Sequence, residues 1–206
     1  MHFTKIPEPK VVLAEINVLV PHLYAALENG TMKAREYFEQ EGVAVDRYLA
    51  PEIVRYHAKT FLDSVSEGLF STEPLARNGL YIKDFHDLEI RMFKSSDGEL
   101  PIPRSKARED YYEQMTLAVF DPPSPLKLVV LWNVVFPYNL VPLTLACPRS
   151  GDLEKMEAEA HWYARIPYPA QEASFGSSDA TDPDVEKLIK PKKKPKTGTD
   201  DESKEQ

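Results

Sequence analysis

Apolar residues recur every three or four positions in the first part of the chain, which predicts amphipathic helices. The first helical face is formed by Val12, Ile16, Leu19, Leu23 and Leu27. Pro21 lies inside this run and should kink or split the helix, because proline lacks a backbone donor. Asn29-Gly30 is expected to end it, since both residues tolerate a positive φ. A second helix is predicted over 32–40, with Thr31 as its N-cap and Gly42 at its end.

A third helix is predicted to begin near Pro51, a residue favoured in the first turn, and to close at Gly68. One stripe of it contains Ile53, His57, Phe61 and Val65. His57 lies on this apolar stripe, so we expect a core or boundary histidine with one hydrogen bond. A further short helix is predicted from an N-cap at Ser105 through Met115.

After Pro74 the apolar period changes from that of a helix to that of a strand. Residues 78–85 and 88–94 have strand character, and His86-Asp87 is the expected turn between them. Residues 126–136 are apolar on both faces, which predicts a central strand that is covered on both sides.

The chain is then expected to return after a turn at 136–140, through a strand ending at Cys147. Residues 148–152 are expected to form a loop. The last strand, 158–166, alternates cleanly. Its inward positions are predicted to be Ala158, Ala160, Trp162, Ala164 and Ile166.

Helices followed by strands favour an α+β fold over a parallel βαβ sheet. We expect N-terminal helices packed on a mostly antiparallel β-meander of about five strands. Residues 1–74 are the helical part and 75–166 the sheet part of the same domain. Residues 167–206 are predicted to be a disordered charged tail, because they have too few large apolar residues to offset chain entropy.

Composition narrows the classes of function. The net charge of −8 and pI near 5.2 argue against non-specific binding to nucleic acid or anionic lipid, although a local basic patch is compatible with them. The one cysteine, Cys147, cannot form an internal disulfide, and we expect a buried structural thiol. The start lacks the features of a signal peptide, and no apolar run is long enough to span a bilayer. The expected location is the cytoplasm, with no membrane association.

An acidic-x-basic pattern on the second predicted strand is the first candidate for chemistry. Glu89 and Arg91 alternate there, and Asp84 precedes them. The pattern faintly resembles nuclease strands that hold a magnesium ion, although such sites prefer lysine at the last position and an aspartate farther upstream. A solvated sheet face explains the same residues and is favoured. His86-Asp87 likewise indicates a turn rather than a metal pair, and no metal site or cofactor is expected.

A second candidate is a polar stripe on the last predicted strand, which contains Glu159, His161, Tyr163 and Arg165. If Glu89 and Arg91 lie on a neighbouring strand, these side chains form one ionisable face suited to binding a partner. Exposed strand faces carry such residues routinely, so the solvated face remains the favoured interpretation.

A lysine run in the tail is the sharpest local signal. It contains Lys190, Lys192, Lys193, Lys194 and Lys196. Such runs bind phosphate groups or direct nuclear import. Acidic blocks flank this one on both sides and no aromatic residue is interleaved for base stacking, so a solubilising tail is favoured.

The sequence contains no P-loop, GxGxxG, HExxH, CxxC, EF-hand or G-x-S-x-G motif. The leading hypothesis is therefore a non-enzymatic intracellular interaction or accessory protein, whose partner is another protein. The alternatives are a metal-dependent nuclease or other hydrolase using Asp84, Glu89 and Arg91, and nucleic-acid binding through the lysine run. The sequence leaves the oligomeric state open.

Overall fold

The computed structural model describes residues 5–73, 80–113, 125–135 and 139–169. These residues belong to the first of two compact units, 1–170 and 171–206. The helices are α1 (Pro9–Glu15), α2 (Val20–Glu41), α3 (Leu49–Val65) and α4 (Lys106–Tyr112). The strands are β1 (Ser71–Thr72), β2 (Leu80–Phe85), β3 (Leu88–Lys94), β4 (Leu126–Trp132), β5 (Val134–Val135), β6 (Asn139–Leu140), β7 (Thr144–Asp152) and β8 (Glu157–Arg165).

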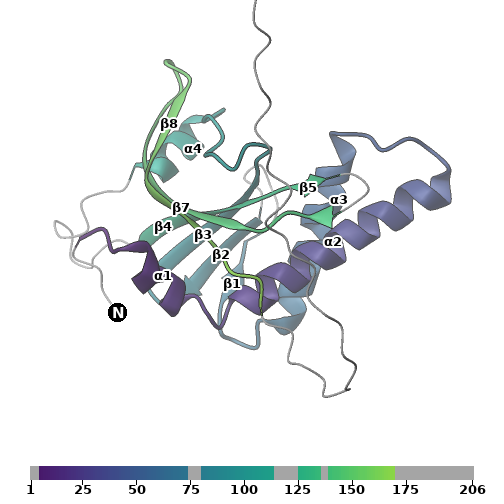
Figure 1. The fold of residues 1–206 in the computed structure, drawn as a ribbon, viewed down its shortest axis with the longest axis horizontal. Coiled ribbons are helices and arrows are strands. Elements are labelled where there is room, and N and C mark those ends of the chain that lie inside the picture. Colours follow the sequence, from purple (N-terminus) through teal and green to yellow (C-terminus); the bar gives the residue numbers. More distant parts are fainter. Residues whose placement is uncertain (1–4, 74–79, 114–124, 136–138, 170–206) are drawn as a thin grey trace, which may run out of the picture. The chain divides into compact units, whose positions relative to one another are not determined.

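Within the described residues, the main sheet has six strands in the order β1-β2-β3-β4-β7-β8 (Figure 1), and β5 and β6 form a separate pair. Neighbouring strands are antiparallel except β3 and β4, which run parallel from Leu88↔Leu126 to Lys94↔Trp132. The predicted α+β fold with a mostly antiparallel sheet is confirmed. The parallel pair departs from a simple meander, because the long connection through α4 brings the chain back to the end of the sheet where β3 began.

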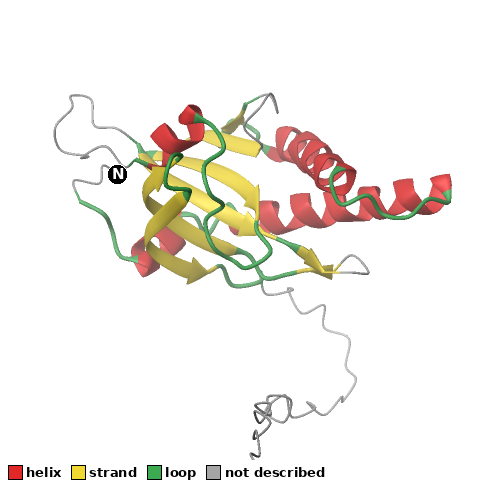
Figure 2. Cartoon of the chain, turned by 90° about the horizontal axis from the view of Figure 1, so that it is seen from above, coloured by secondary structure: helices red, strands yellow, loops and turns green. Residues whose placement is uncertain are grey.

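Helices cover both faces of this sheet. On one face, α1, α2 and α3 pack on the larger core, which includes Leu23, Ile90 and Trp132. On the other, α4 adds Tyr111 and Tyr112 to a smaller core with Phe93 and Val129; Figure 2 shows this helix against the sheet. The central strand β4 is buried on both sides, as its apolar pattern predicted.

Helix α2 corrects one prediction. It runs without a break through Asn29-Gly30-Thr31, so the expected helix end and the N-cap at Thr31 are wrong. Gly30 faces α3, and a Cβ atom there would overlap the Val54 carbonyl oxygen and lie 3.0 Å from the Val54 Cα. The glycine therefore permits close helix packing rather than a left-handed turn. Gly42 ends the helix with a φ of 61°, as predicted.

The predicted split near Pro21 is confirmed. Helix α1 stops at Glu15, and Pro21 lies in the first turn of α2, where a missing N–H is tolerated. The two helices are bent by 78° at this break. Among the described residues, no single helix is both long and apolar enough to cross a membrane, and α1 and α2 meet that test only when taken together.

The C-terminal hairpin corrects a second prediction, because residues 148–152 form the end of β7 rather than a loop. Pairing with β8 continues to Asp152↔Glu157, with register shifts on both sides of Pro148. Proline lacks a ladder donor, so it fits a strand at such an irregularity. The predicted turn at 136–140 falls partly on 136–138, outside the described residues. Its last two residues, Asn139 and Leu140, form β6, which pairs with β5, so the predicted turn extended too far. Met115 also lies outside them, and α4 ends at Tyr112.

Candidate functional site

An open groove of about 810 Å³ lies between α2, α3 and the ends of β3 and β4. The parallel strands finish here at the paired residues Lys94 and Trp132, and the Ser95 N–H donates to the Trp132 carbonyl oxygen at 2.9 Å. We call this cavity the α2–α3 groove. It is lined by Thr31, Ala34, Arg35, Phe38, Glu39, Gly42, Val43, Ala44, Val45, Arg47, Ala50, Pro51, Val54, Lys94, Trp132 and Val134.

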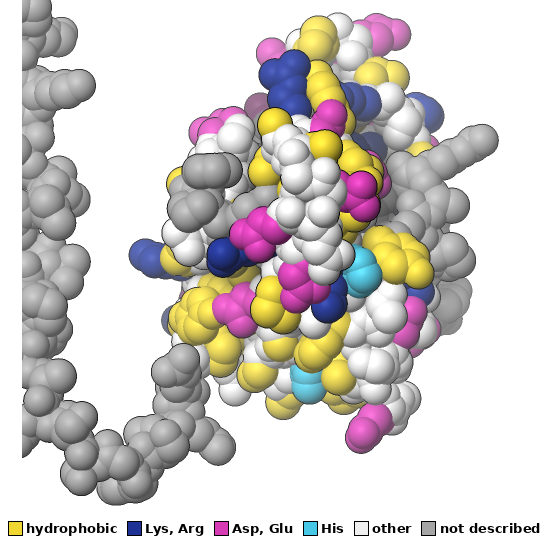
Figure 3. Space-filling view, turned by 90° about the vertical axis from the view of Figure 1, so that its right-hand side faces the viewer, with side chains coloured by type: hydrophobic (Ala, Val, Ile, Leu, Met, Phe, Trp, Pro, Cys, Tyr) yellow, Lys and Arg dark blue, Asp and Glu magenta, His cyan; other side chains and the backbone are white. Residues whose placement is uncertain are grey.

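The groove has a mostly apolar lining, to which Arg35, Glu39, Arg47 and Lys94 add charged side chains. Val43 and Val45, in the link between α2 and α3, are 53% and 39% exposed. Arg35 pairs with Glu39 across one turn of α2. Figure 3 views the end of the molecule where α2 and α3 meet and shows hydrophobic side chains beside lysine and arginine side chains. A mostly apolar lining with a small number of polar or charged groups is usual for a binding groove.

Two buried polar atoms belong to side chains that line the groove. The Thr31 hydroxyl and the Trp132 indole Nε1 have no hydrogen-bond partner within the described residues. Thr31 is 4% exposed and Trp132 is 2% exposed. A buried polar group without a partner costs about 1–3 kcal/mol, so each of these two atoms lowers the stability of the fold at the groove.

A second cavity, of about 540 Å³, adjoins the groove and shares Pro51 and Lys94 with it. We call it the basic pocket. Its lining residues come from α3, the end of β3, the following loop and α4: Pro51, Arg55, Met92, Phe93, Lys94, Ser95, Ser96, Asp97, Glu99, Leu100, Pro101, Ile102, Arg104 and Arg108. Four of these side chains are cationic and two are acidic, so the pocket is locally positive in a chain whose net charge is −8.

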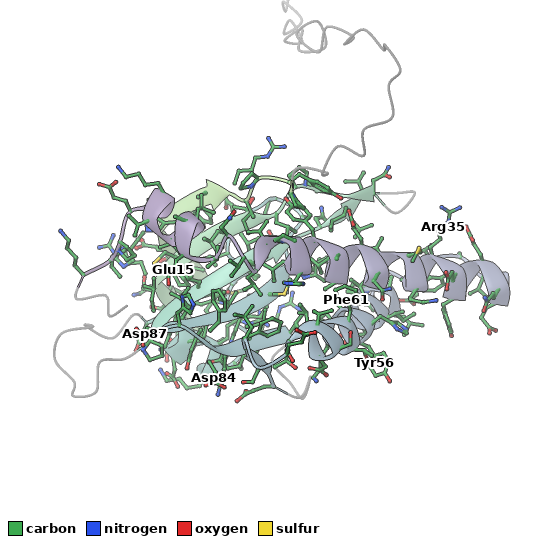
Figure 4. All side chains as sticks on the ribbon, turned by 90° about the horizontal axis from the view of Figure 1, so that it is seen from below. Glu15, Arg35, Tyr56, Phe61, Asp84 and Asp87 are labelled. Atoms are coloured by element: carbon green, nitrogen blue, oxygen red, sulfur yellow. The ribbon has the colours of Figure 1, made fainter. Side chains whose placement is uncertain are left out.

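Glu89 and Asp84, the two carboxylates of the hydrolase hypothesis, have different hydrogen-bond partners. The Glu89 carboxylate accepts a hydrogen bond from the Tyr81 hydroxyl on the neighbouring strand. Asp84 lies near the outer edge of the sheet (Figure 4) and accepts a hydrogen bond from Ser71. Its φ is 58°, and it falls where the β2–β3 register is irregular. The described hydrogen bonds thus direct the two carboxylates toward different partners.

Arg91 lies on the same face of β3 as Glu89, and it is 8% exposed. Its guanidinium lies 4.7 Å from the Tyr81 ring centroid and 4.0 Å from that of Tyr111. The Nε and one terminal nitrogen (NH1) are buried without a hydrogen-bond partner in the described chain. Contact with two aromatic faces compensates part of that desolvation. The arrangement fixes α4 to the sheet.

Tyr81 and Tyr111 complete this buried polar cluster. Burial, followed by the hydrogen bond and charge of Glu89, raises the pKa of Tyr81. The Tyr111 hydroxyl contacts the carbonyl oxygens of Glu89 at 2.9 Å and Leu128 at 2.7 Å, which bridges the parallel strands. Burial also raises the pKa of Tyr111 well above its usual value, so both phenols stay protonated at neutral pH and act as hydrogen-bond donors.

The polar stripe of β8 lies apart from Glu89 and Arg91, because β4 and β7 stand between β3 and β8. Glu159 pairs with Arg149 of β7 at 3.6 Å. Burial, and then the charge of Arg149, lower the pKa of His161. The Tyr163 hydroxyl accepts a hydrogen bond from the Leu100 backbone N–H at 3.3 Å. Arg165 occupies the next outward-facing position and is exposed.

Potential metal ligands and nucleophiles are dispersed. Within the described ranges, no group of three or more His, Cys, Asp or Glu side chains could hold a metal ion. The His86 Nδ1 contacts the carboxylate of Glu15 on α1. Cys147 is buried, and burial raises the pKa of its thiol to about 12, which makes it a poor nucleophile at neutral pH. The five lysines of the run at 190–196 lie outside the described residues.

Sequence reasoning missed the basic pocket. Arg55, Lys94 and the arginines of α4 and its preceding loop are far apart in the chain, so their convergence depends on the tertiary fold. The available signal was the close spacing of Arg104 and Arg108 on either side of the predicted N-cap at Ser105.

No protein-family model matches this chain, and neither the curated proteins nor the solved structures that were compared with it show significant similarity.

Proposed function

We propose that the chain is a non-enzymatic interaction protein that binds a segment of a partner protein in the α2–α3 groove. The observation that carries the proposal is the size and lining of this groove, which has a volume of about 810 Å³ and a mostly apolar lining at the end of the parallel strand pair. Grooves between packed helices that present apolar side chains commonly receive the apolar face of a peptide.

The chemistry of the partner follows from the side chains that line the groove. Val43 and Val45 offer exposed apolar contacts, while Lys94 lies between the groove and the basic pocket. A partner segment with apolar side chains and a neighbouring acidic residue matches both features, because opposite charges across an interface favour the correct register. We therefore assign the groove to an acidic, amphipathic peptide segment.

The hydrolase hypothesis has less support from the same contacts. Glu89 and Arg91 are engaged with the tyrosines that join α4 to the sheet, and Asp84 is engaged with Ser71. These contacts favour a structural role for all three side chains. A magnesium-dependent nuclease activity that disappears in Glu89→Gln would restore the hypothesis.

Selection from a displayed peptide library tests the proposal with the full chain as the target. Selected peptides should combine apolar residues with at least one Asp or Glu. The double variant Val43→Asp/Val45→Asp should bind them at least about tenfold more weakly, because it places charges on an apolar contact surface. The affinities are to be measured by isothermal titration calorimetry.

Val18→Asp is the matched control. Val18 is 54% exposed, close to the 53% of Val43, and it does not line the groove. This variant should bind the selected peptides with unchanged affinity, and all variants should keep the unfolding midpoint of the parent chain. Peptides that bind the parent chain and the Val43→Asp/Val45→Asp variant equally well would contradict the assignment of the groove.

A further inference from the structure

The basic pocket gathers four cationic side chains from separate parts of the chain. Arg55 comes from α3, Lys94 from the end of β3, Arg104 from the following loop and Arg108 from α4. Bringing like charges together is unfavourable unless counterions or a ligand offset their repulsion. The acidic side chains near the pocket therefore decide how much of its positive charge is left uncompensated.

Few protein anions neutralise this pocket. Arg55 pairs with Glu52 on the same helix. Within the described part of the chain, no ion pair is found for Lys94, Arg104 or Arg108. The pocket thus retains an excess of positive charge.

The two acidic residues of the lining offset this excess only in part. Asp97 accepts hydrogen bonds from the Ser95 hydroxyl at 2.7 Å and the Glu99 N–H at 3.0 Å, and these bonds hold its loop. Its carboxylate is therefore committed to local structure. Glu99 is exposed, and no ion pair to it is found within the described residues.

Arg108 is held in place for binding. Its guanidinium carbon lies 4.5 Å from the Phe93 ring centroid. Desolvation is the main reason that the pKa of Arg108 is lowered, and Tyr112 opposes this effect. The positive charges of Arg104, Arg91 and Arg55 lower the pKa further. An arginine stacked on an aromatic ring keeps its planar N–H groups free to bind an oxyanion in two-point fashion.

We propose that the basic pocket is an oxyanion-binding site that takes a phosphate or carboxylate group, with Arg104 and Arg108 as its principal donors. The inference goes beyond the proposed function and does not depend on it, because Arg104 and Arg108 line the basic pocket and do not line the α2–α3 groove. Phosphate and carboxylate share the chemistry that guanidinium groups recognise, so both are tested as ligands.

Calorimetric titration of the full chain with inorganic phosphate, O-phosphoserine and succinate tests the site. Each titration is matched to one with sodium chloride of equal ionic strength, since general screening affects all charged surfaces. We expect saturable binding of at least one oxyanion. Binding of phosphate and phosphoserine alone would identify a phosphate ester site, and binding of succinate alone would identify a carboxylate site.

Arg104→Ala should weaken this binding at least about tenfold. Arg104 is exposed, so its removal should leave the fold intact. A second variant, Arg108→Lys, keeps the positive charge but removes the planar pair of N–H donors. Lys106→Ala is the control, because it removes one charge between these residues without altering the lining of the pocket. Oxyanion titrations that match sodium chloride, or equal losses in Lys106→Ala and Arg104→Ala, would overturn the proposal.

Discussion

At the scale of single residues, a few polar side chains hold distant parts of the chain together. Tyr24 of α2 is the clearest case. Its hydroxyl donates to the Ile166 carbonyl oxygen at 2.9 Å and accepts from the Leu143 N–H at 3.0 Å. Burial is the main reason that the pKa of Tyr24 is raised. One phenol therefore connects a helix with the chain next to β7 and β8.

Replacing Tyr24 with Phe should lower the free energy of unfolding by about 1–3 kcal/mol, because the Leu143 N–H is left buried without this partner. Chemical denaturation followed by circular dichroism measures the change. Tyr37→Phe is the control, since Tyr37 is 42% exposed and lies on the same helix. A Tyr24→Phe variant as stable as Tyr37→Phe would show that the two hydrogen bonds contribute no net stability.

At the scale of elements, the sequence predicted the type of most segments better than their ends. Alternation located the strands that pair, and the apolar stripe of α3 located a helix. Gly30 and Pro148 misled the interpretation, because each is usually found where an element ends. Here Gly30 serves packing against Val54, and Pro148 lies at a register shift inside β7. Local propensity cannot reveal either tertiary role.

The substitution Gly30→Ala tests the contact between α2 and α3, because the sign of its effect on the free energy of unfolding depends on that contact. In an isolated helix the change should stabilise by about 1 kcal/mol. In this protein the added methyl group overlaps the Val54 carbonyl, and such overpacking typically costs about 1–3 kcal/mol.

We therefore expect Gly30→Ala to lower the free energy of unfolding, as measured by urea denaturation. Met32→Ala, at a position of α2 that is 52% exposed, should change it by less than about 0.5 kcal/mol. An increase in stability for Gly30→Ala would mean that the α2–α3 contact is looser than the structure indicates.

At the scale of the whole molecule, the core and both cavities belong to residues 1–170. A chain that ends at Ala170 keeps Tyr168, whose ring centroid lies 4.4 Å from that of Tyr24. We expect this shortened chain to match the full chain in thermal unfolding midpoint, because every described element is retained. A clearly lower midpoint would show that residues 171–206 contribute to folding stability.

The same pair of chains tests the nucleic-acid hypothesis for the lysine run. Fluorescence anisotropy with single-stranded RNA at about 50 and 200 mM salt should give equal affinities for both chains, since acidic blocks flank the lysines. Salt-sensitive binding by the full chain alone would instead support nucleic-acid binding.

The amino-acid pattern alone determined the fold class, the split of the first helix near Pro21 and the central position of β4. Each follows from local periodicity or backbone chemistry, which can be determined from residues that are close together in the sequence. Tertiary structure decided the parallel pairing of β3 with β4, the continuity of α2 and the convergence of Arg55, Arg104 and Arg108. These features depend on which distant segments meet, and only packing of the complete core selects those partners.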